Sequence, residues 1–152
     1  MLTSNKSFLQ ATGFKVVIND QYRNLEFFAQ SAQHPGATVN AVDIGIPKLS
    51  SLPVLGDKIT YSELTLNLIV DEDMAAYKEM QRWMETTIEN TSGIESDITL
   101  VILTSHNNKN IQIKYEGCMP TNIGAIEFNS STGDASYITF DATFRFTKFE
   151  IN

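Results

Sequence analysis

Few side chains in this sequence have the types and the spacing that catalysis or metal binding requires. The two histidines, His34 and His106, are isolated from each other beside turn sequences, and the single cysteine, Cys118, has no second cysteine or histidine close by in the chain. A cysteine nucleophile needs a base within reach, and a zinc site needs further cysteine or histidine ligands. We therefore expect two exposed loop histidines and a packed, unreactive cysteine.

The acidic triplet Asp71-Glu72-Asp73 has oxygens that could ligate a hard cation, but it lacks the spaced ligands and the glycine of a calcium loop. It precedes a helical pattern, and acidic residues are favourable at the positive end of a helix dipole, where either aspartate could cap the helix. The chain contains no glycine-rich phosphate loop, no GxSxG elbow and no HExxH motif. The sequence thus predicts no enzyme, no cofactor and no metal site.

Composition restricts the class of protein further. The 152 residues are 42% hydrophobic and carry a net charge of −7, which predicts one globular domain, residues 1–152, without repeats or linkers. The negative charge argues against wrapping nucleic acid through phosphate contacts, although nucleic acid could pass nearby without binding. No apolar run approaches the ~20 residues that span a bilayer, so no membrane insertion is expected. The first residues lack a signal-peptide core, which favours synthesis without general secretory export.

A long alternating run near the C-terminus is the clearest structural pattern. Between Ser136 and Phe149 the apolar positions on one face are Ile138, Phe140, Ala142, Phe144 and Phe146. Period-2 alternation is typical of a half-buried strand, and these residues would extend over about 46 Å, against about 17–20 Å for a common strand. We expect such a strand to exceed its partners within a small domain, which suggests pairing, curvature or closure that involves other subunits.

Shorter patterns give the remaining elements. Strands are expected at residues 13–19, 25–29, 37–46 with a register change near Ala41, 59–70, 98–103, 111–117 and 124–129, with a turn at 117–124. One helix is expected from Asp71 to Glu89, with an apolar stripe of Met74, Tyr77, Met80, Met84 and Ile88 and with Trp83 beside it. The sequence therefore predicts a mainly β protein with about seven or eight mostly antiparallel strands and one α-helix.

The segment Pro47–Asp57 is predicted to be a loop because it contains two prolines, two serines and a Gly-Asp pair. Four large apolar side chains lie in it: Leu49, Leu52, Val54 and Leu55. Side chains of this kind are unfavourable in water, so they either fold back onto the domain or insert into a neighbouring subunit.

Three segments together resemble a known family. They are Gly56–Leu68, Asp71–Met84 with Tyr77, Met80 and Trp83 in a Y-x-x-M-x-x-W pattern, and Glu116–Phe146 with Gly117-x-x-Pro-Thr-Asn-Ile-Gly124 and Thr139–Phe144. In this order and spacing the chain resembles the tail tube proteins of contractile-tailed bacteriophages and the tube-like domains of their baseplate tube-cap proteins. The N-terminal third matches only in its strand pattern.

The resemblance implies two packed antiparallel sheets, a sandwich or half-barrel flanked by the helix, in a homohexameric ring. Such rings stack into a hollow tube, the conduit for DNA delivery into the host. In that family each subunit contributes four strands to the barrel that lines the channel, and a long loop contacts the adjacent ring. The implied partners are the subunit itself, the tail sheath, the baseplate and the tail terminator, and DNA passes without specific binding. The implied location is the virion, after synthesis in the bacterial cytoplasm.

Two groups of residues are the candidate sites under this interpretation. The ring-stacking loop comprises Pro47, Lys48, Leu49, Leu52, Val54 and Leu55. The polar faces of the two longest predicted strands supply the candidates that line the lumen: Glu63, Thr65, Asn67, Thr139, Asp141, Thr143 and Arg145.

Three alternatives remain open at the level of the sequence. A baseplate tube-initiator or cap subunit is possible, although such proteins usually carry extra domains, and so is the tube subunit of a phage-derived contractile injection system. A small-ligand β-barrel carrier is the alternative from a different class. A carrier would be a monomer whose apolar strand faces line a closed cavity, and its long apolar loop would have no explanation.

Overall fold

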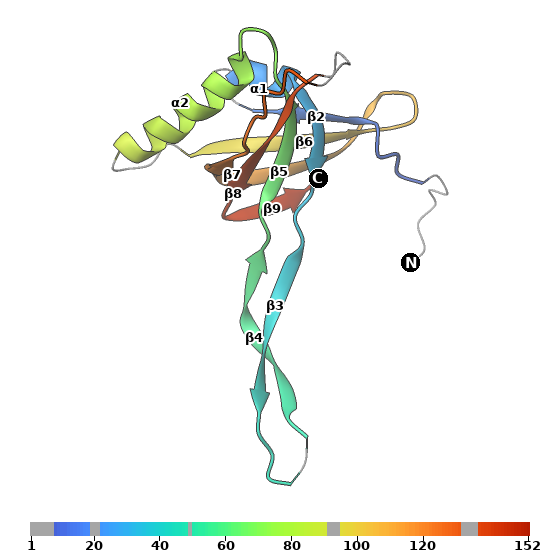
Figure 1. Ribbon diagram of the computed structural model, residues 1–152. Coiled ribbons are helices and arrows are strands. Elements are labelled where there is room, and N and C mark those ends of the chain that lie inside the picture. The colour runs from blue at the N-terminus through green and yellow to red at the C-terminus, as the bar shows by residue number, and fades with distance from the viewer. Residues whose placement is uncertain (1–7, 19–21, 49, 91–94, 132–136) are drawn as a thin grey trace.

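The computed structural model of the chain describes residues 8–18, 22–48, 50–90, 95–131 and 137–152 (Figure 1). Its elements are β1 (Phe14–Val17), α1 (Arg23–Phe27), β2 (Ala29–Gln33), β3 (Ala37–Ile44), β4 (Leu52–Tyr61), β5 (Leu64–Ile69), α2 (Ala75–Glu89), β6 (Ser96–Leu103), β7 (Lys109–Ile123), β8 (Thr139–Arg145) and β9 (Lys148–Ile151). No helix in these ranges is long and apolar enough to cross a membrane.

Two antiparallel sheets form the body, and they share β7. In the first sheet β7 pairs with β6 and β9, and β1 pairs with β6. In the second sheet the order is β2–β5–β8–β7. The predicted class, mainly β with two antiparallel sheets and a flanking helix, is confirmed, with one additional short helix.

A kink in β7 marks the point where one sheet becomes the other. Gly117 has φ +66°, and a Cβ at this position would lie 2.9 Å from Thr147 Oγ1, so a side chain would be strained there. The chain opposite kinks as well, because β8 ends at Arg145 and β9 begins at Lys148. Strands β8 and β9 pair along the same side of β7, and the Thr147 N–H donates to the Glu116 carbonyl between them.

The prediction of a single strand over Ser136–Phe149 that needs another subunit is therefore wrong. The run is two strands, and the long strand β7 matches both of them within the chain. The alternation of apolar and polar residues in this run is present in the structure. It could not reveal that the run would pair with β7, another long strand of the same domain. Residue Ser136 itself lies outside the described residues.

The predicted turn at 117–124 and the strand at 124–129 are also wrong. Strand β7 continues through Pro120 to Ile123, and residues 124–129 contain no strand. Pro120 is tolerated because this part of β7 is an edge of the sheet, paired with β8 on one side only, and proline is found at sheet edges. The Gly124 N–H then donates to the Asp141 carbonyl at 2.7 Å as the chain leaves the sheet.

The core lies between the second sheet, the first sheet and α2. Its main contributors on β5 and β8 are Leu64, Leu66, Leu68, Phe140, Ala142 and Phe144, all at most 2% exposed. Helix α2 covers this face with Ala76, Met80 and Trp83, and the Trp83 ring lies 5.2 Å from the Phe144 ring. The predicted stripe is thus rotated towards Ala76 and Trp83, and Ile88, near the end of the helix, is exposed.

Helix α2 begins four residues later than predicted. The Asp71 side chain accepts a hydrogen bond from the Ala75 N–H at 2.8 Å, which confirms the capping role predicted for this aspartate. Met74, at the cap position, adopts a left-handed backbone conformation with φ 53°, and this turn separates the acidic triplet from the first helical residue.

The strand predicted at 25–29 is the helix α1, and the reason is tertiary. Glu79 of α2 accepts hydrogen bonds from the backbone N–H groups of Asn24 (3.1 Å) and Leu25 (3.2 Å) and from Asn24 Nδ2 (2.6 Å). These N–H groups are the ones that a helix start leaves without partners. Tyr22 also stacks on Trp83 at 4.4 Å. Partners more than 50 residues away in sequence therefore decide the conformation of this segment.

Strands β3 and β4 form a separate hairpin that projects away from the body (Figure 1). The predicted loop Pro47–Asp57 is largely β4, and the predicted strand 59–70 is divided at Ser62 and Glu63 between β4 and β5. The register change near Ala41 is confirmed, because Asn40 alone lies opposite residues 56–58. A Cβ on Gly56 would lie 1.9 Å from the Asn40 carbonyl oxygen, so this bulge requires glycine.

An aromatic cluster holds the base of the hairpin. It comprises His34, Tyr61, Tyr115, Phe146 and Phe149, whose ring centroids lie 4.8–6.2 Å apart in the contacting pairs. The Ser62 N–H donates to the Gly36 carbonyl at 2.9 Å and closes the hairpin base. Because β2 and β5 are fixed in the body, the cluster sets the direction in which the hairpin projects.

His34 is exposed, as predicted, but it is also part of this cluster. Its Nδ1 lies 2.7 Å from the Tyr115 hydroxyl, and burial of Tyr115 raises the pKa of that phenol. A buried phenol needs an acceptor for its proton, so the Nδ1 of neutral His34 accepts and the ring proton lies on Nε2. Partial burial lowers the pKa of His34 from its usual value of 6.5.

Replacing Glu79 by alanine should destabilise the domain by about 2 kcal/mol, because three donors at the start of α1 lose their charged acceptor. Denaturant unfolding followed by fluorescence of Trp83 would measure the loss. Glu85→Ala is the matched control, since Glu85 is exposed on the same helix and should change the free energy of unfolding by less than about 0.5 kcal/mol. Equal effects of the two variants would show that Glu79 does not support α1.

The free energy of unfolding should fall as the pH decreases below about 6.5, the unfolded-state pKa of histidine. The folded state holds His34 at a lowered pKa, so the unfolded chain binds more protons in this range and stability is lost. His34→Gln should flatten this dependence between pH 7.5 and the folded pKa. An unaltered pH profile in His34→Gln would contradict the assignment.

Candidate assembly surfaces

The described residues contain no cluster that resembles a catalytic or metal centre. No group of three or more histidine, cysteine, aspartate or glutamate side chains within them is arranged to hold a metal ion. Burial raises the pKa of Cys118 to about 12, so the thiol stays protonated, and its Sγ donates to the Tyr115 carbonyl at 3.5 Å. His106 contacts Ser105 in an exposed turn. The surfaces of the fold, rather than a pocket, are therefore the candidate sites.

The polar face of the second sheet collects most of the residues predicted to line a lumen. Thr65 and Asn67 of β5 alternate with fully buried leucines, so they point away from the core, opposite Thr143 and Asp141 of β8. Asn67 Nδ2 donates to Asp141 Oδ1 at 2.7 Å. Thr139 and Arg145 lie on the same face of β8, whereas Glu63 is exposed just before β5 begins.

Two neighbouring strands extend this face with residues that sequence reasoning missed. Ser31 and Gln33 of β2 lie opposite Asn67 and Thr65, and Asn122 of β7 lies opposite Thr143. The sequence placed a strand before β2 and a turn over Asn122, so their alternation was not recognised. With Asp141 and Arg145 as its charged members on β8, the face is mostly uncharged and polar.

The second sheet has two open edges within the described part of the chain. Strand β2 pairs with β5 on one side only, and residues 119–123 of β7 pair with β8 on one side only. An open edge presents unpaired N–H and C=O groups to any strand that can align with it. The four-stranded sheet is thus able to accept a strand at either side.

The β3–β4 hairpin exposes apolar side chains on both of its strands. Leu52 and Leu55 are 51% and 82% exposed, and Pro47, Lys48 and Val54 are exposed too. The sequence missed Val42 and Ile44 of β3, which lie opposite Val54 and Leu52 and are also exposed. These exposures exclude the alternative that the segment folds back as a lid over its own sheet. Leu49 lies outside the described residues.

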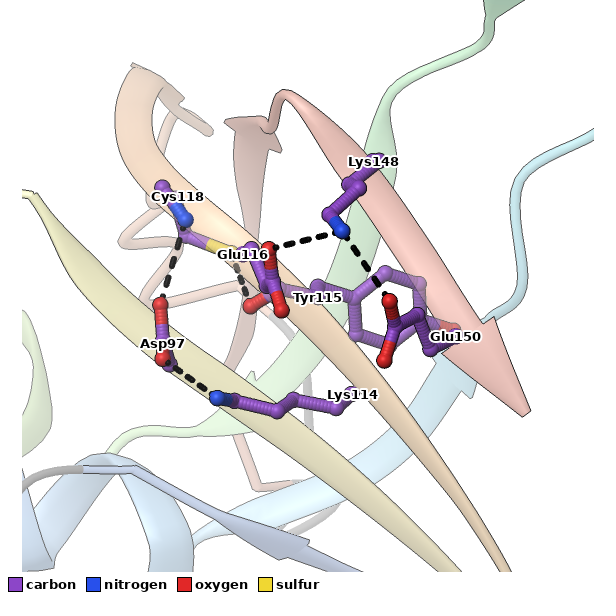
Figure 2. Close-up of polar contacts among 8 residues, drawn as sticks. Asp97, Lys114, Tyr115, Glu116, Cys118, Lys148 and Glu150 are labelled. Carbon is purple, nitrogen blue, oxygen red and sulfur yellow. Dashed lines mark hydrogen bonds and ion pairs between the residues drawn. The ribbon is translucent and has the colours of Figure 1, made fainter. Parts of the chain in front are cut away.

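The outer face of the first sheet is charged, in contrast to the polar face of the second sheet. Lys114 Nζ lies 3.0 Å from Asp97 Oδ2, and Lys148 Nζ lies 3.5 Å from Glu116 and 3.0 Å from Glu150 (Figure 2). The hydrogen bond from Lys114 is the main cause of the lowered pKa of Asp97. These partly exposed pairs alternate in sign and contribute little to stability. They mark a hydrated surface that faces away from the core.

Within the described residues, the apolar faces of both sheets pack against one another and against α2, and this packing does not fit the closed ligand cavity that the carrier alternative requires. The fully buried residues include Leu66, Leu68, Ile98, Tyr115 and Trp83, and they belong to a single packed cluster. A surface depression of about 760 Å³ lies instead beside exposed Phe8 and Leu9 at the β6–β7 turn.

Solved structures that share this fold include parts of a contractile injection system. The chain aligns with the sheath–tube complex of the extracellular contractile injection system PVC in its extended state (TM-score 0.74, 13% identity, 97% of this chain and 93% of that chain). It also aligns with the tube-terminating cap of the anti-feeding prophage (TM-score 0.76, 14% identity, 100% and 95%). A type six secretion system protein is less similar (TM-score 0.56, 11% identity, 93% and 83%). At these identities the likeness shows the fold alone.

Sequence comparison gives the family. No curated protein matches the sequence significantly. A family model described as phage tail tube protein matches residues 2–115, which is about three quarters of the chain. The match includes the projecting hairpin, α2 and the first half of β7, and the solved structures independently share the fold. The chain therefore belongs to the phage tail tube protein family.

Proposed function

We propose that this tail tube protein forms six-membered rings that stack into a hollow tube for delivery of DNA. The observation that carries the proposal is a four-stranded sheet with one polar face, one buried face and two open edges. A sheet that closes on itself across subunits has no edges left. Edge-to-edge pairing of β2 with residues 119–123 of a neighbouring copy would close such a ring.

A ring of six copies with four strands each makes a barrel of 24 strands. Barrels of about 16–18 strands already leave an aqueous channel, so a barrel of this size would be open and wide. Helix α2 and the first sheet already cover the apolar face of each four-stranded sheet, so the polar face is the one that suits the water-filled side. Glu63, Thr65, Asn67, Thr139, Asp141, Thr143 and Arg145 are the proposed channel residues.

The charges on this face suit passage of DNA rather than binding. Arg145 and Asp141 oppose each other in sign, and the remaining members on β5 and β8 are uncharged. Tight binding of DNA requires several lysine or arginine contacts to phosphates. A face without a row of basic residues would let the polymer slide past.

The hairpin is the proposed contact between rings. Its apolar residues are exposed on the described part of the subunit, and burying each of them could contribute up to about 1.5–3 kcal/mol. We include Pro47, Lys48, Leu49, Leu52, Val54 and Leu55 in this contact. The proposed further partners are sheath, baseplate and terminator proteins of a virion or injection particle, assembled after synthesis in the bacterial cytoplasm.

A cap or terminator subunit is the second candidate, because the likeness to the anti-feeding prophage cap is as strong as the likeness to the sheath–tube complex. The two roles differ in what the purified protein does. A tube subunit polymerises into long tubes, whereas a terminator stops after a single ring. The tube role is the one proposed here, because a projecting apolar hairpin is suited to repeated stacking.

Purified protein should form rings of six 17.0 kDa chains, about 102 kDa, and tubes at high concentration. The double variant Leu52→Ser/Leu55→Ser should keep the ring mass and the melting temperature, because both side chains are exposed in the subunit, but its tubes should be short or absent. Native mass measurement and electron microscopy check both parts. A monomer at every concentration would overturn the proposal, and long tubes from the double variant would remove the hairpin from the stacking contact.

A cysteine at position 141 should be shielded inside assembled tubes. Asp141→Cys is expected to resist a maleimide on a polymer too large to enter the channel, and to react once the tubes are dissociated. Lys114→Cys, on the charged outer face, is the matched control and should react in both states, while wild-type Cys118 stays buried. Rapid labelling of position 141 in intact tubes would place this face outside the channel.

A further inference from the structure

Two short connections join the hairpin to the body, and one of them contains a titratable side chain to which the proposed function assigns no role. Residues 34–36 lead from β2 into β3, and residues 62–63 lead from β4 into β5. His34 is the first residue of the entering connection, directly before Pro35 and Gly36. The position of His34 therefore sets the point at which the hairpin leaves the body.

Both sides of the hairpin base pack on the same residues of the body. The ring of His34 lies 4.8 Å from the ring of Phe149 in β9, and Tyr61, the last residue of β4, lies 5.2 Å from the same ring. Tyr115 of β7 is fully buried, and its ring contacts both His34 and Phe149. The base of the hairpin is thus docked on Phe149 and Tyr115, which belong to the first sheet.

One hydrogen bond in this contact depends on the protonation state of His34. The Tyr115 hydroxyl lies 2.7 Å from His34 Nδ1, and His34 is the hydrogen-bond partner of this hydroxyl among the described residues. Neutral His34 accepts the phenol proton at Nδ1, whereas both ring nitrogens of the imidazolium are donors. Protonation therefore leaves the proton of a buried hydroxyl without an acceptor. A loss of this kind commonly changes an equilibrium by about fivefold or more.

The charged side chains of the surrounding strands do not face His34. They are Lys114 and Glu116 beside Tyr115, Lys148 and Glu150 beside Phe149, Arg145 of β8, Glu63 before β5, and Asp57 and Lys58 of β4. The first four form ion pairs on the outer face of the first sheet (Figure 2), the next two continue the polar alternation of β8 and β5, and the last two lie at the bulge farther along the hairpin. No carboxylate among the described residues therefore offsets a positive charge on His34, and burial is the cause of its lowered pKa.

We propose that protonation of His34 releases the base of the hairpin from the body. With neutral His34 the hairpin is held in one direction by Tyr115 and Phe149, and with charged His34 it is free to turn about its two connections. The docked form holds His34 at a lowered pKa, whereas the released form leaves the side chain at its usual pKa of 6.5, so release takes up a proton. The docked form is therefore favoured above pH 6.5 and loses this advantage as the pH falls towards the docked pKa.

A consequence for assembly rests on the proposed function. If the hairpin is the contact between rings, a hairpin that is held in one direction loses less conformational freedom on stacking than a released one. Neutral pH should then favour tubes, and mild acid should weaken them.

The distance between a spin label on the hairpin and a spin label on the body measures release directly. Leu55→Cys and Glu85→Cys provide two exposed labelling sites, whereas Cys118 is buried and stays unlabelled. Labelled chains are diluted in unlabelled protein below the concentration of tube formation, so that each measured distance lies within one chain. We expect one narrow distance distribution at pH 7.5 and an additional broad one at about pH 5, with the ratio of docked to released hairpin lowered by at least about fivefold. Circular dichroism at each pH verifies that the body stays folded.

Three variants assign the release to the contact between His34 and Tyr115. His34→Gln cannot be protonated, so its distance distribution should be the same at both pH values. Tyr115→Phe keeps the ring but removes the hydroxyl, so protonation of His34 leaves no donor without an acceptor and the response to pH should be lost. Tyr61→Phe is the matched control, because it removes a hydroxyl from the same cluster without altering the hydrogen bond of His34, and it should respond like the wild type.

The outcomes separate this inference from the proposed function. Identical wild-type distributions at the two pH values, or a response of His34→Gln as large as that of the wild type, would overturn the inference. Sedimentation gives the concentration needed for tube formation, which should rise by about two- to fivefold in acid for the wild type but not for His34→Gln. If the spin labels report release while the protein forms no tubes at any pH, the proposed function fails and the release of the hairpin by His34 stands.

Discussion

The shared strand β7 is the constraint on which the rest of the structure depends. One face of the fold is a charged, hydrated sheet and the other is a polar four-stranded sheet, and both are hydrogen-bonded to the same 15-residue strand. The kink at Gly117, together with the break between β8 and β9, allows the single strand β7 to pair with neighbours in both sheets. The orientation of the charged sheet relative to the polar sheet follows from this corner.

The body and the hairpin differ in how far they bury their apolar residues. The body buries a core of apolar residues between its two sheets and α2, whereas the hairpin buries almost none of its own. The aromatic cluster around Tyr115 joins the two parts and fixes the hairpin without covering its apolar strands. A domain of this kind is stable as a subunit but keeps a large surface that is unfavourable in water, which is the condition for assembly.

The distribution of charge fits a tube subunit. The paired lysines and carboxylates lie on the first sheet, and the polar face of the second sheet is nearly free of charge. Most of the net charge of −7 thus comes from residues elsewhere, including the acidic start of α2. A total charge could not have revealed this separation, because only the sheet register shows which side chains share a face.

Local patterns in the sequence determined the class, the alternation of β5 and β8, the helix α2 with its Asp71 cap, and the bulge near Ala41. Each of these follows from the period of neighbouring residues, which the chain carries wherever it folds. Only the tertiary structure decided that residues 23–27 are a helix, because the partner that caps them, Glu79, is distant in sequence. It also decided that Lys109–Ile123 is one strand and that the hairpin projects, since open sheet edges and exposure depend on which strands are neighbours in space.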